Sequence, residues 1–73
     1  MRLGKYLSSL TKPELVKLEE QLNLTDDEAP VFLALSKGRS RTRIAGDNLI
    51  SMSTVDARIR DINYKLQRIL KGV

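Results

Sequence analysis

The chain has 73 residues, a formal charge of +4, and no Cys, His or Trp. A chain of this length is expected to form one domain, residues 1–73, and buries only about 60% of its unfolded surface, too little to enclose a roomy active site. Without Cys and His, disulfides, thiolate zinc sites and the common general-base arrangements lose their usual members. We therefore expect neither an enzyme nor a protein that holds a cofactor, a metal or a small-molecule substrate.

The sequence shows no signal for export or for a membrane. Its first ten residues contain no uninterrupted apolar run of about 7–15 residues, the length of a signal-peptide core. Nor does any stretch approach the roughly 20 apolar residues of a transmembrane helix. These features predict a cytoplasmic protein without a membrane partner.

Charge is distributed unevenly along the chain. Residues 1–36 contain four basic and six acidic residues, a formal charge of −2, whereas residues 37–73 contain nine basic and three acidic residues, a charge of +6. A basic half in a small domain suggests a surface for a polyanion. The alternative is that the charged residues only keep the domain soluble.

The first 23 residues predict two short helices. Leucines recur every three or four positions in both, as in a helix with one buried face. Between them, Thr11 and Glu14 have the spacing of a capping box, so the second helix is expected over about 12–22. The leucines are Leu3, Leu7 and Leu10 in the first helix and Leu15, Leu18 and Leu22 in the second.

A second capping box, Thr25 with Glu28, precedes an almost uninterrupted apolar run over residues 29–35. A helix that is apolar nearly all round is one that other helices pack against, so we expect this one at the centre of the core. Gly38 is expected to end it.

Three arginines crowd the start of the next helix, which is expected over about 41–48 with Ser40 as its N-cap and with Ile44 and Ala45 facing inward. Each guanidinium opposes the helix dipole there, at a cost of about 0.3–1 kcal/mol. A bound phosphate would offset this cost, because helix N-terminal amides and Arg both attract it. The alternative is that solvated arginines tolerate the penalty on an exposed loop. These arginines are Arg39, Arg41 and Arg43.

The last helix begins after a cap at Ser51 or Ser53 and is expected to extend to Leu70. Its apolar residues are spaced by four, three and four positions, which puts them on one face. The opposite face has small residues at its start and then polar ones. Such a helix can enter a DNA major groove with its first two turns while its inner face packs on a core. The inner residues are Val55, Ile59, Ile62 and Leu66, and the outer ones are Ser53, Ala57, Arg60, Asp61 and Tyr64.

Residues 24–66 resemble the LuxR/GerE-type helix-turn-helix DNA-binding domain without a gap. The related promoter-binding helix-turn-helix domain of sigma factors has similar spacing. The residues that carry the resemblance are Leu24-Thr25, Glu28, Val31, Gly38, Ser40, Ile44-Ala45, Ile50-Ser51, Thr54-Val55, Ile59, Ile62 and Lys65-Leu66.

The resemblance implies an all-α fold, a small helical bundle with a helix-turn-helix core over residues 24–70. The extra N-terminal helices, residues 1–23, would complete the core or supply a surface for a dimer or partner. The recognition helix would be about 53–66, in the major groove. The implied DNA-binding residues are Arg39, Ser40, Arg41, Thr42, Arg43, Ser53, Thr54, Asp56, Ala57, Arg58 and Arg60.

Asp56 and Asn48 are among the positions that depart from the family pattern. Asp56 stands where members commonly have a basic residue; it either caps the helix, as the third residue after Ser53, or accepts a hydrogen bond from a cytosine amino group. Asn48 stands where a buried leucine is usual, so we expect Leu49 to fill that place with the turn shifted.

The expected function is a bacterial or phage-type transcriptional regulator that binds double-stranded DNA. Arg60 is expected to read a base, since Arg to guanine is the commonest specific contact; the alternative is an i,i+4 partner for Asp56. Arg41 and Arg43 are assigned to phosphates, which requires both to share one side of the molecule with the outer face of the recognition helix.

A different class of function also fits the fold. The chain would then be a protein-interaction module that binds RNA polymerase or another regulator, as a monomer or a homodimer, because a fold does not fix a function. Asp56 and Asp61 on the outer part of the long helix favour this alternative.

Overall fold

The computed structural model describes residues 3–71, which form five helices and no strand. The prediction of an all-α bundle is confirmed. The helices are α1 (Leu3–Ser8), α2 (Lys12–Leu22), α3 (Glu28–Ser36), α4 (Arg41–Asn48) and α5 (Met52–Leu70).

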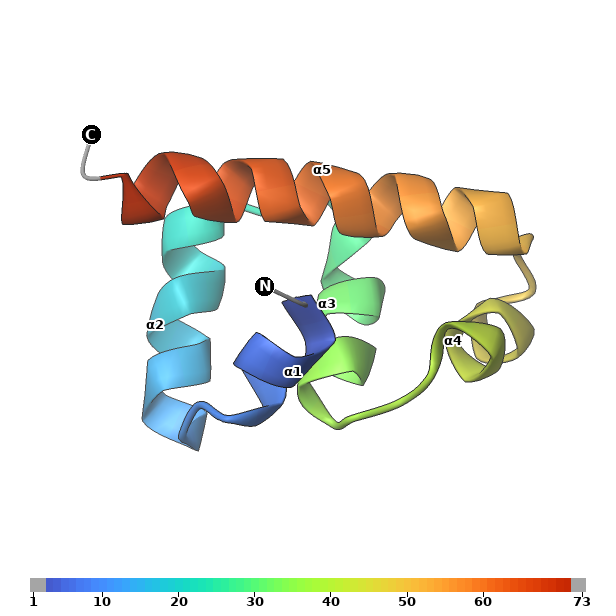
Figure 1. The fold of residues 1–73 in the computed structure, drawn as a ribbon, viewed down its shortest axis with the longest axis horizontal. Helices are drawn as coiled ribbons and strands as arrows, with labels where there is room; N and C mark the ends of the chain where they lie inside the picture. Colours follow the sequence, from blue (N-terminus) through green and yellow to red (C-terminus); the bar gives the residue numbers. More distant parts are fainter. Residues whose placement is uncertain (1–2, 72–73) are drawn as a thin grey trace.

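The longest helix, α5, organises the arrangement of the others (Figure 1). It runs the length of the molecule, with α2 against its C-terminal half, α3 against its middle and α4 against its N-terminal half. Helix α1 packs on α3 instead. No helix within residues 3–71 has the length and hydropathy of a membrane span.

The core is a single cluster to which all five helices contribute. Phe32 at its centre is fully buried, as the apolar run of α3 predicted. Leu7 of α1 is also fully buried, and Leu18 and Leu22 of α2 are nearly so, so the N-terminal helices complete the core. The other buried residues are Leu3, Val31, Leu35, Ile44, Ala45, Val55, Ile62 and Leu66.

Both predicted capping boxes are present. The Thr11 amide donates to the Glu14 carboxylate at 2.8 Å, and the Glu14 amide donates back to the Thr11 hydroxyl at 3.4 Å. Thr25 and Glu28 repeat this exchange at 3.1 and 3.2 Å. These local hydrogen bonds fix where α2 and α3 begin, because they satisfy amides that have no partner inside the helix.

Glu28 does more than cap α3. Its side chain is buried, and the same oxygen that accepts from the Thr25 amide also accepts from the Lys65 ammonium of α5 at 2.5 Å. Burial alone raises the pKa of Glu28, but the hydrogen bonds from Lys65 and Thr25 and the attraction of the ammonium outweigh it, so the pKa lies below its ordinary value of 4.5. This contact ties the start of α3 to the C-terminal half of α5.

Helices α3 and α4 end in the same type of left-handed turn. After α3, Gly38 has φ of 79°, and the amides of Gly38 and Arg39 donate to the carbonyls of Leu35 and Ala34. This double hydrogen bond is a Schellman motif, in which glycine is the favoured residue. Gly38 therefore ends α3 as predicted.

After α4, the left-handed position is occupied by a leucine. Leu49 has φ of 55°, and the following amide of Ile50 donates to the Ala45 carbonyl at 3.0 Å. The side chain of Leu49 is 92% exposed, and Ile50 packs against the core instead. The prediction that Leu49 fills a buried position is wrong, because the left-handed turn directs its side chain into solvent.

Replacing Lys65 by Met is expected to lower the free energy of unfolding by about 2–3 kcal/mol at neutral pH, because it leaves the buried Glu28 carboxylate without its charged partner. Urea denaturation measures the loss. Since the folded pKa of Glu28 is depressed, the contribution of the pair is present above about pH 4.5 and is lost as the pH falls through the folded pKa. The difference between the two proteins should therefore shrink in acid. Exposed Lys17→Met is the control, and an equal loss there would contradict the assignment.

Replacing Leu49 by Gly is expected to raise the free energy of unfolding by up to about 1 kcal/mol. Glycine removes a left-handed penalty of about 1–2 kcal/mol, although it also adds freedom to the unfolded chain. Asn23→Gly is the matched control, because Asn23 has a similar φ of 52° and asparagine already tolerates that conformation. A Leu49→Gly protein no more stable than the Asn23→Gly protein in urea would refute the prediction.

Candidate nucleic-acid interface

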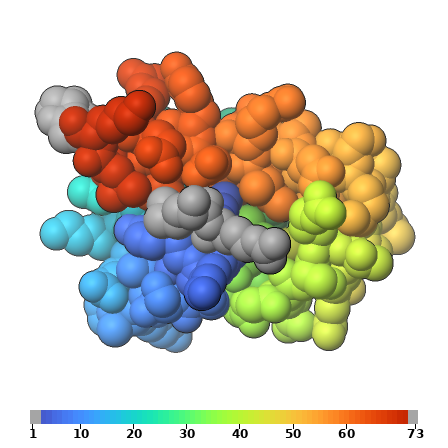
Figure 2. Space-filling model, in the orientation of Figure 1, coloured from blue at the N-terminus to red at the C-terminus, as the bar shows by residue number. Residues whose placement is uncertain are grey.

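Helices α4 and α5 form one end of the molecule and are joined by a short turn. Ile44 and Ala45 of α4 are buried and face Val55 of α5 in the common core, as predicted. In the space-filling view, the two helices form one continuous surface at the right-hand end (Figure 2). The shared core fixes their relative position, so side chains from both helices can act on one ligand.

Ser51, not Ser53, is the N-cap of α5. The Thr54 amide donates to the Ser51 hydroxyl at 3.1 Å, and the hydroxyls of Ser51 and Thr54 lie 2.9 Å apart. Ser53 is exposed on the first turn, with its hydroxyl 3.3 Å from that of Ser51. Ser53 is therefore available on the outer face, whereas Thr54 is half-buried.

Asp56 forms an ion pair between the two helices. Its carboxylate lies 2.5 Å from the Arg41 guanidinium, and both side chains are about half exposed. The prediction that Asp56 caps α5 is wrong, because Ser51 has that role and Asp56 lies a full turn further on. The i,i+4 alternative for Arg60 is not seen either, since Asp56 pairs with Arg41.

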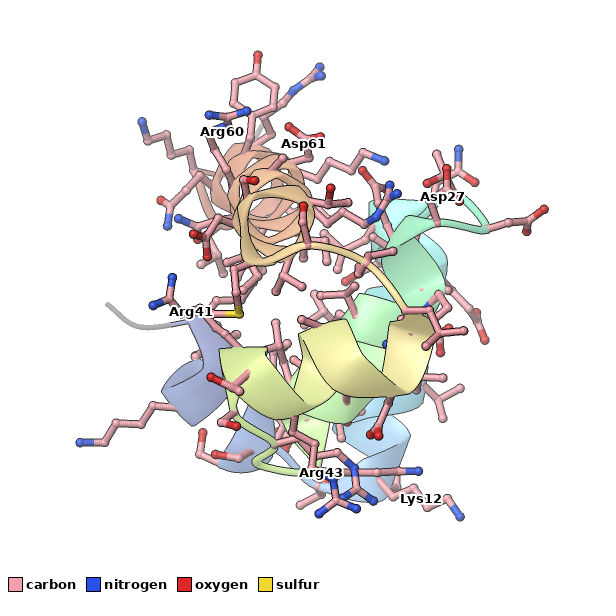
Figure 3. All side chains as sticks on the ribbon, turned by 90° about the vertical axis from the view of Figure 1, so that its right-hand side faces the viewer. Lys12, Asp27, Arg41, Arg43, Arg60 and Asp61 are labelled. Atoms are coloured by element: carbon pink, nitrogen blue, oxygen red, sulfur yellow. The ribbon has the colours of Figure 1, made fainter. Side chains whose placement is uncertain are left out.

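The ion pair places Arg41 on the same side of α5 as Arg60. Residues four apart lie on one side of a helix, so Asp56, which Arg41 contacts, is a neighbour of Arg60 on that side. Figure 3 looks at this end of the molecule and shows Arg41 to the left, beside α1, and Arg60 at the upper left of α5. Arg60 is exposed and has no ion-pair partner within residues 3–71.

Arg43 and Arg58 lie elsewhere. Arg43 pairs with Asp47 on its own helix at 3.5 Å, and Figure 3 shows it below α4, on the opposite side from α5. Arg58 points across α5 to Asp27 at the start of α3, at 3.6 Å. The requirement that Arg41 and Arg43 share one side with the outer face of α5 is met by Arg41 alone.

The remaining predicted residues lie near Arg41 or on the outer face of α5. Ser40 caps α4, with its hydroxyl accepting from the Arg43 amide at 3.2 Å, and Thr42 is exposed in the first turn. Ala57 is half-buried on the outer face of α5. Arg39 is half-buried and lines a groove that also contains Lys5 of α1. Lys5 was not predicted, because nothing in the sequence indicates that α1 lies beside the start of α4.

The two serines at the start of α5 provide a test of the cap. Ser51→Ala is expected to lower the free energy of unfolding by about 1 kcal/mol, because it leaves the Thr54 amide without its acceptor. Ser53→Ala should change it by less than about 0.5 kcal/mol, as is usual for an exposed position. Urea denaturation of the two variants measures both values. A larger loss for Ser53→Ala would reverse the assignment.

Comparisons with known proteins return no match for this chain, whether with protein-family models, curated proteins or solved structures. The resemblance to the LuxR/GerE-type domain therefore depends on the residues quoted above.

Proposed function

We propose that this protein is a sequence-specific DNA-binding transcriptional regulator, with the N-terminal half of α5 in the major groove and the start of α4 on the adjacent sugar-phosphate backbone. The observation that carries the proposal is the ion pair that brings Arg41 of α4 to Asp56 of α5, one turn before Arg60. Arg41, near the N-terminus of α4, and Arg60, on the outer face of α5, can then contact the same DNA duplex.

The outer face of α5 suits a close approach to DNA bases. Ser53 and Ala57 are small, so the helix backbone can come near the groove floor without steric conflict. The major groove is about 12 Å wide and admits an α-helix. One turn beyond Asp56, Arg60 has the length and the paired donors to reach a guanine.

Arg41 is available to a phosphate even though it is paired with Asp56. An ion pair between side chains that are both about half exposed contributes only about 0.2–1 kcal/mol. Arg also has five N–H donors, so it can keep its contact with Asp56 and still donate to a phosphate oxygen. The free-energy cost of using Arg41 to bind a phosphate is therefore small.

The placement of the arginines revises their expected roles. Arg41 contacts the sugar-phosphate backbone of the DNA. Arg43 lies on the other side of α4 and is not among the residues that contact DNA. Arg58 stabilises the contact between α5 and the start of α3 through Asp27. Arg43 therefore provides a matched control for Arg41: both are exposed arginines of the same helix, and each is paired with one aspartate.

The test is the binding of a labelled random-sequence duplex, measured by fluorescence anisotropy over a series of salt concentrations. The natural protein should bind at low salt, with affinity that falls as salt rises. Arg41→Ala should reduce the slope of log affinity against log salt by about 0.9, the value for one lost phosphate contact. Arg43→Ala should leave the slope near that of the natural protein. Equal reductions in both variants would contradict the placement, and no binding at low salt would contradict the function.

The second candidate is a protein-interaction module that binds RNA polymerase or another regulator, and it is favoured by two observations. Three of the arginines expected to bind DNA, Arg41, Arg43 and Arg58, are already paired with aspartates, which leaves less unpaired positive charge for DNA. Leu49 exposes a large apolar side chain at the tip of the α4–α5 turn, where a protein partner would bury it. The same experiment separates the two candidates, since a protein-interaction module should not bind the labelled duplex even at low salt.

A further inference from the structure

A groove lies between α1 and the start of α4, beside α5. Among residues 3–71, its lining contains three basic residues and no acidic residue. Two hydroxyl side chains, Ser8 and Ser40, stand at its edges, and most of these side chains are exposed, so the groove is open to solvent. The basic residues are Lys5, Arg39 and Arg41.

The groove is a product of the tertiary structure, because it joins residue 5 to residues 39–41. Helix α1 reaches this position by packing on α3 through Leu3 and Leu7, both buried. A Cβ atom built on Gly4 would lie 3.4 Å from the Leu35 side chain, so the two helices are in close contact there. This packing holds Lys5 at the rim of the groove.

Two of the three basic residues are free to bind an anion. Lys5 and Arg39 have no ion-pair partner within residues 3–71, and Asp56, the partner of Arg41, is not part of the lining. Three cations around one open groove repel one another, and this repulsion is relieved by a bound polyanion. The groove is therefore a basic feature of the side that carries Arg41.

We infer that this groove binds the DNA backbone beyond the stretch contacted by α4, with Lys5 contacting a phosphate there. The inference rests on the proposed function and extends it, because it makes α1 part of the DNA-binding surface. Arg41 belongs both to the groove and to the α4–α5 surface, so a backbone that contacts Arg41 can continue along α1 (Figure 3). A small anion fits less well, because small-ligand sites bury about 70–90% of their ligand and this groove is open.

The experiment compares Lys5→Ala with Lys12→Ala on a random-sequence duplex over a series of salt concentrations. Both lysines are exposed and each variant removes one positive charge, but Lys12 lies at the bottom of Figure 3, on α2. Lys5→Ala should reduce the salt slope by about 0.9 and weaken binding several-fold at moderate salt. Lys12→Ala should not change the slope, and Lys5→Arg should restore it. Thermal melting of each variant checks that the fold is kept.

A second measurement uses duplexes of decreasing length. If α1 contacts the DNA backbone beyond the stretch contacted by α4, the DNA affinities of the Lys5→Ala variant and of the natural protein should become equal once the duplex is too short to reach α1. Equal slopes for Lys5→Ala and Lys12→Ala, with the natural protein still binding DNA, would overturn the inference and leave the proposed function intact. Absence of DNA binding by the natural protein would overturn both. Binding of a nucleoside triphosphate that depends on Lys5, together with DNA affinity that does not depend on Lys5, would identify a small-anion site and overturn the inference alone.

Discussion

The contact between Glu28 and Lys65 holds together segments that are 37 positions apart in the sequence. The carboxylate accepts from the Thr25 amide, three residues before α3, and from the ammonium of α5, so one buried side chain contributes both to the start of α3 and to its attachment to α5. A buried charge is costly unless it is paired and hydrogen-bonded, and here both conditions are met. The remaining helices pack on the frame that α3 and α5 make.

The arginines of residues 37–73 have two roles: they join helices through ion pairs, and their side chains are held in defined directions. Arg41 joins α4 to α5 through Asp56, and Arg58 joins α5 to α3 through Asp27. Exposed pairs of this kind contribute little to stability, but they hold long side chains in defined directions. Arg41 is directed along the edge of α5 toward the groove beside α1. The ion pairs therefore neutralise these arginines locally and also fix the directions of their side chains.

The elements and their ends were predictable because their causes are local. A capping box requires only two side chains three positions apart, and the apolar spacing of α5 requires only a regular helix. Gly38 also ends α3 as expected, since a left-handed residue follows the helix. Leu49 was mispredicted because the same turn occurs there without a glycine, and leucine carries no signal for that conformation. Asp56 was mispredicted as a cap because its ion-pair partner lies on another helix.

By itself, the sequence determined five helices, the capping boxes before α2 and α3, and the faces that become the core, because hydrogen-bonding and hydrophobic spacing within about four residues decide these features. It also determined that the positive charge lies in the second half of the chain. Only the tertiary structure decided that Arg41 shares a side with Arg60 while Arg43 does not, and that Lys5 joins Arg39 and Arg41 around one groove. The physical reason is that the crossing of packed helices sets the direction of each side chain, and that crossing depends on contacts between residues far apart in the chain.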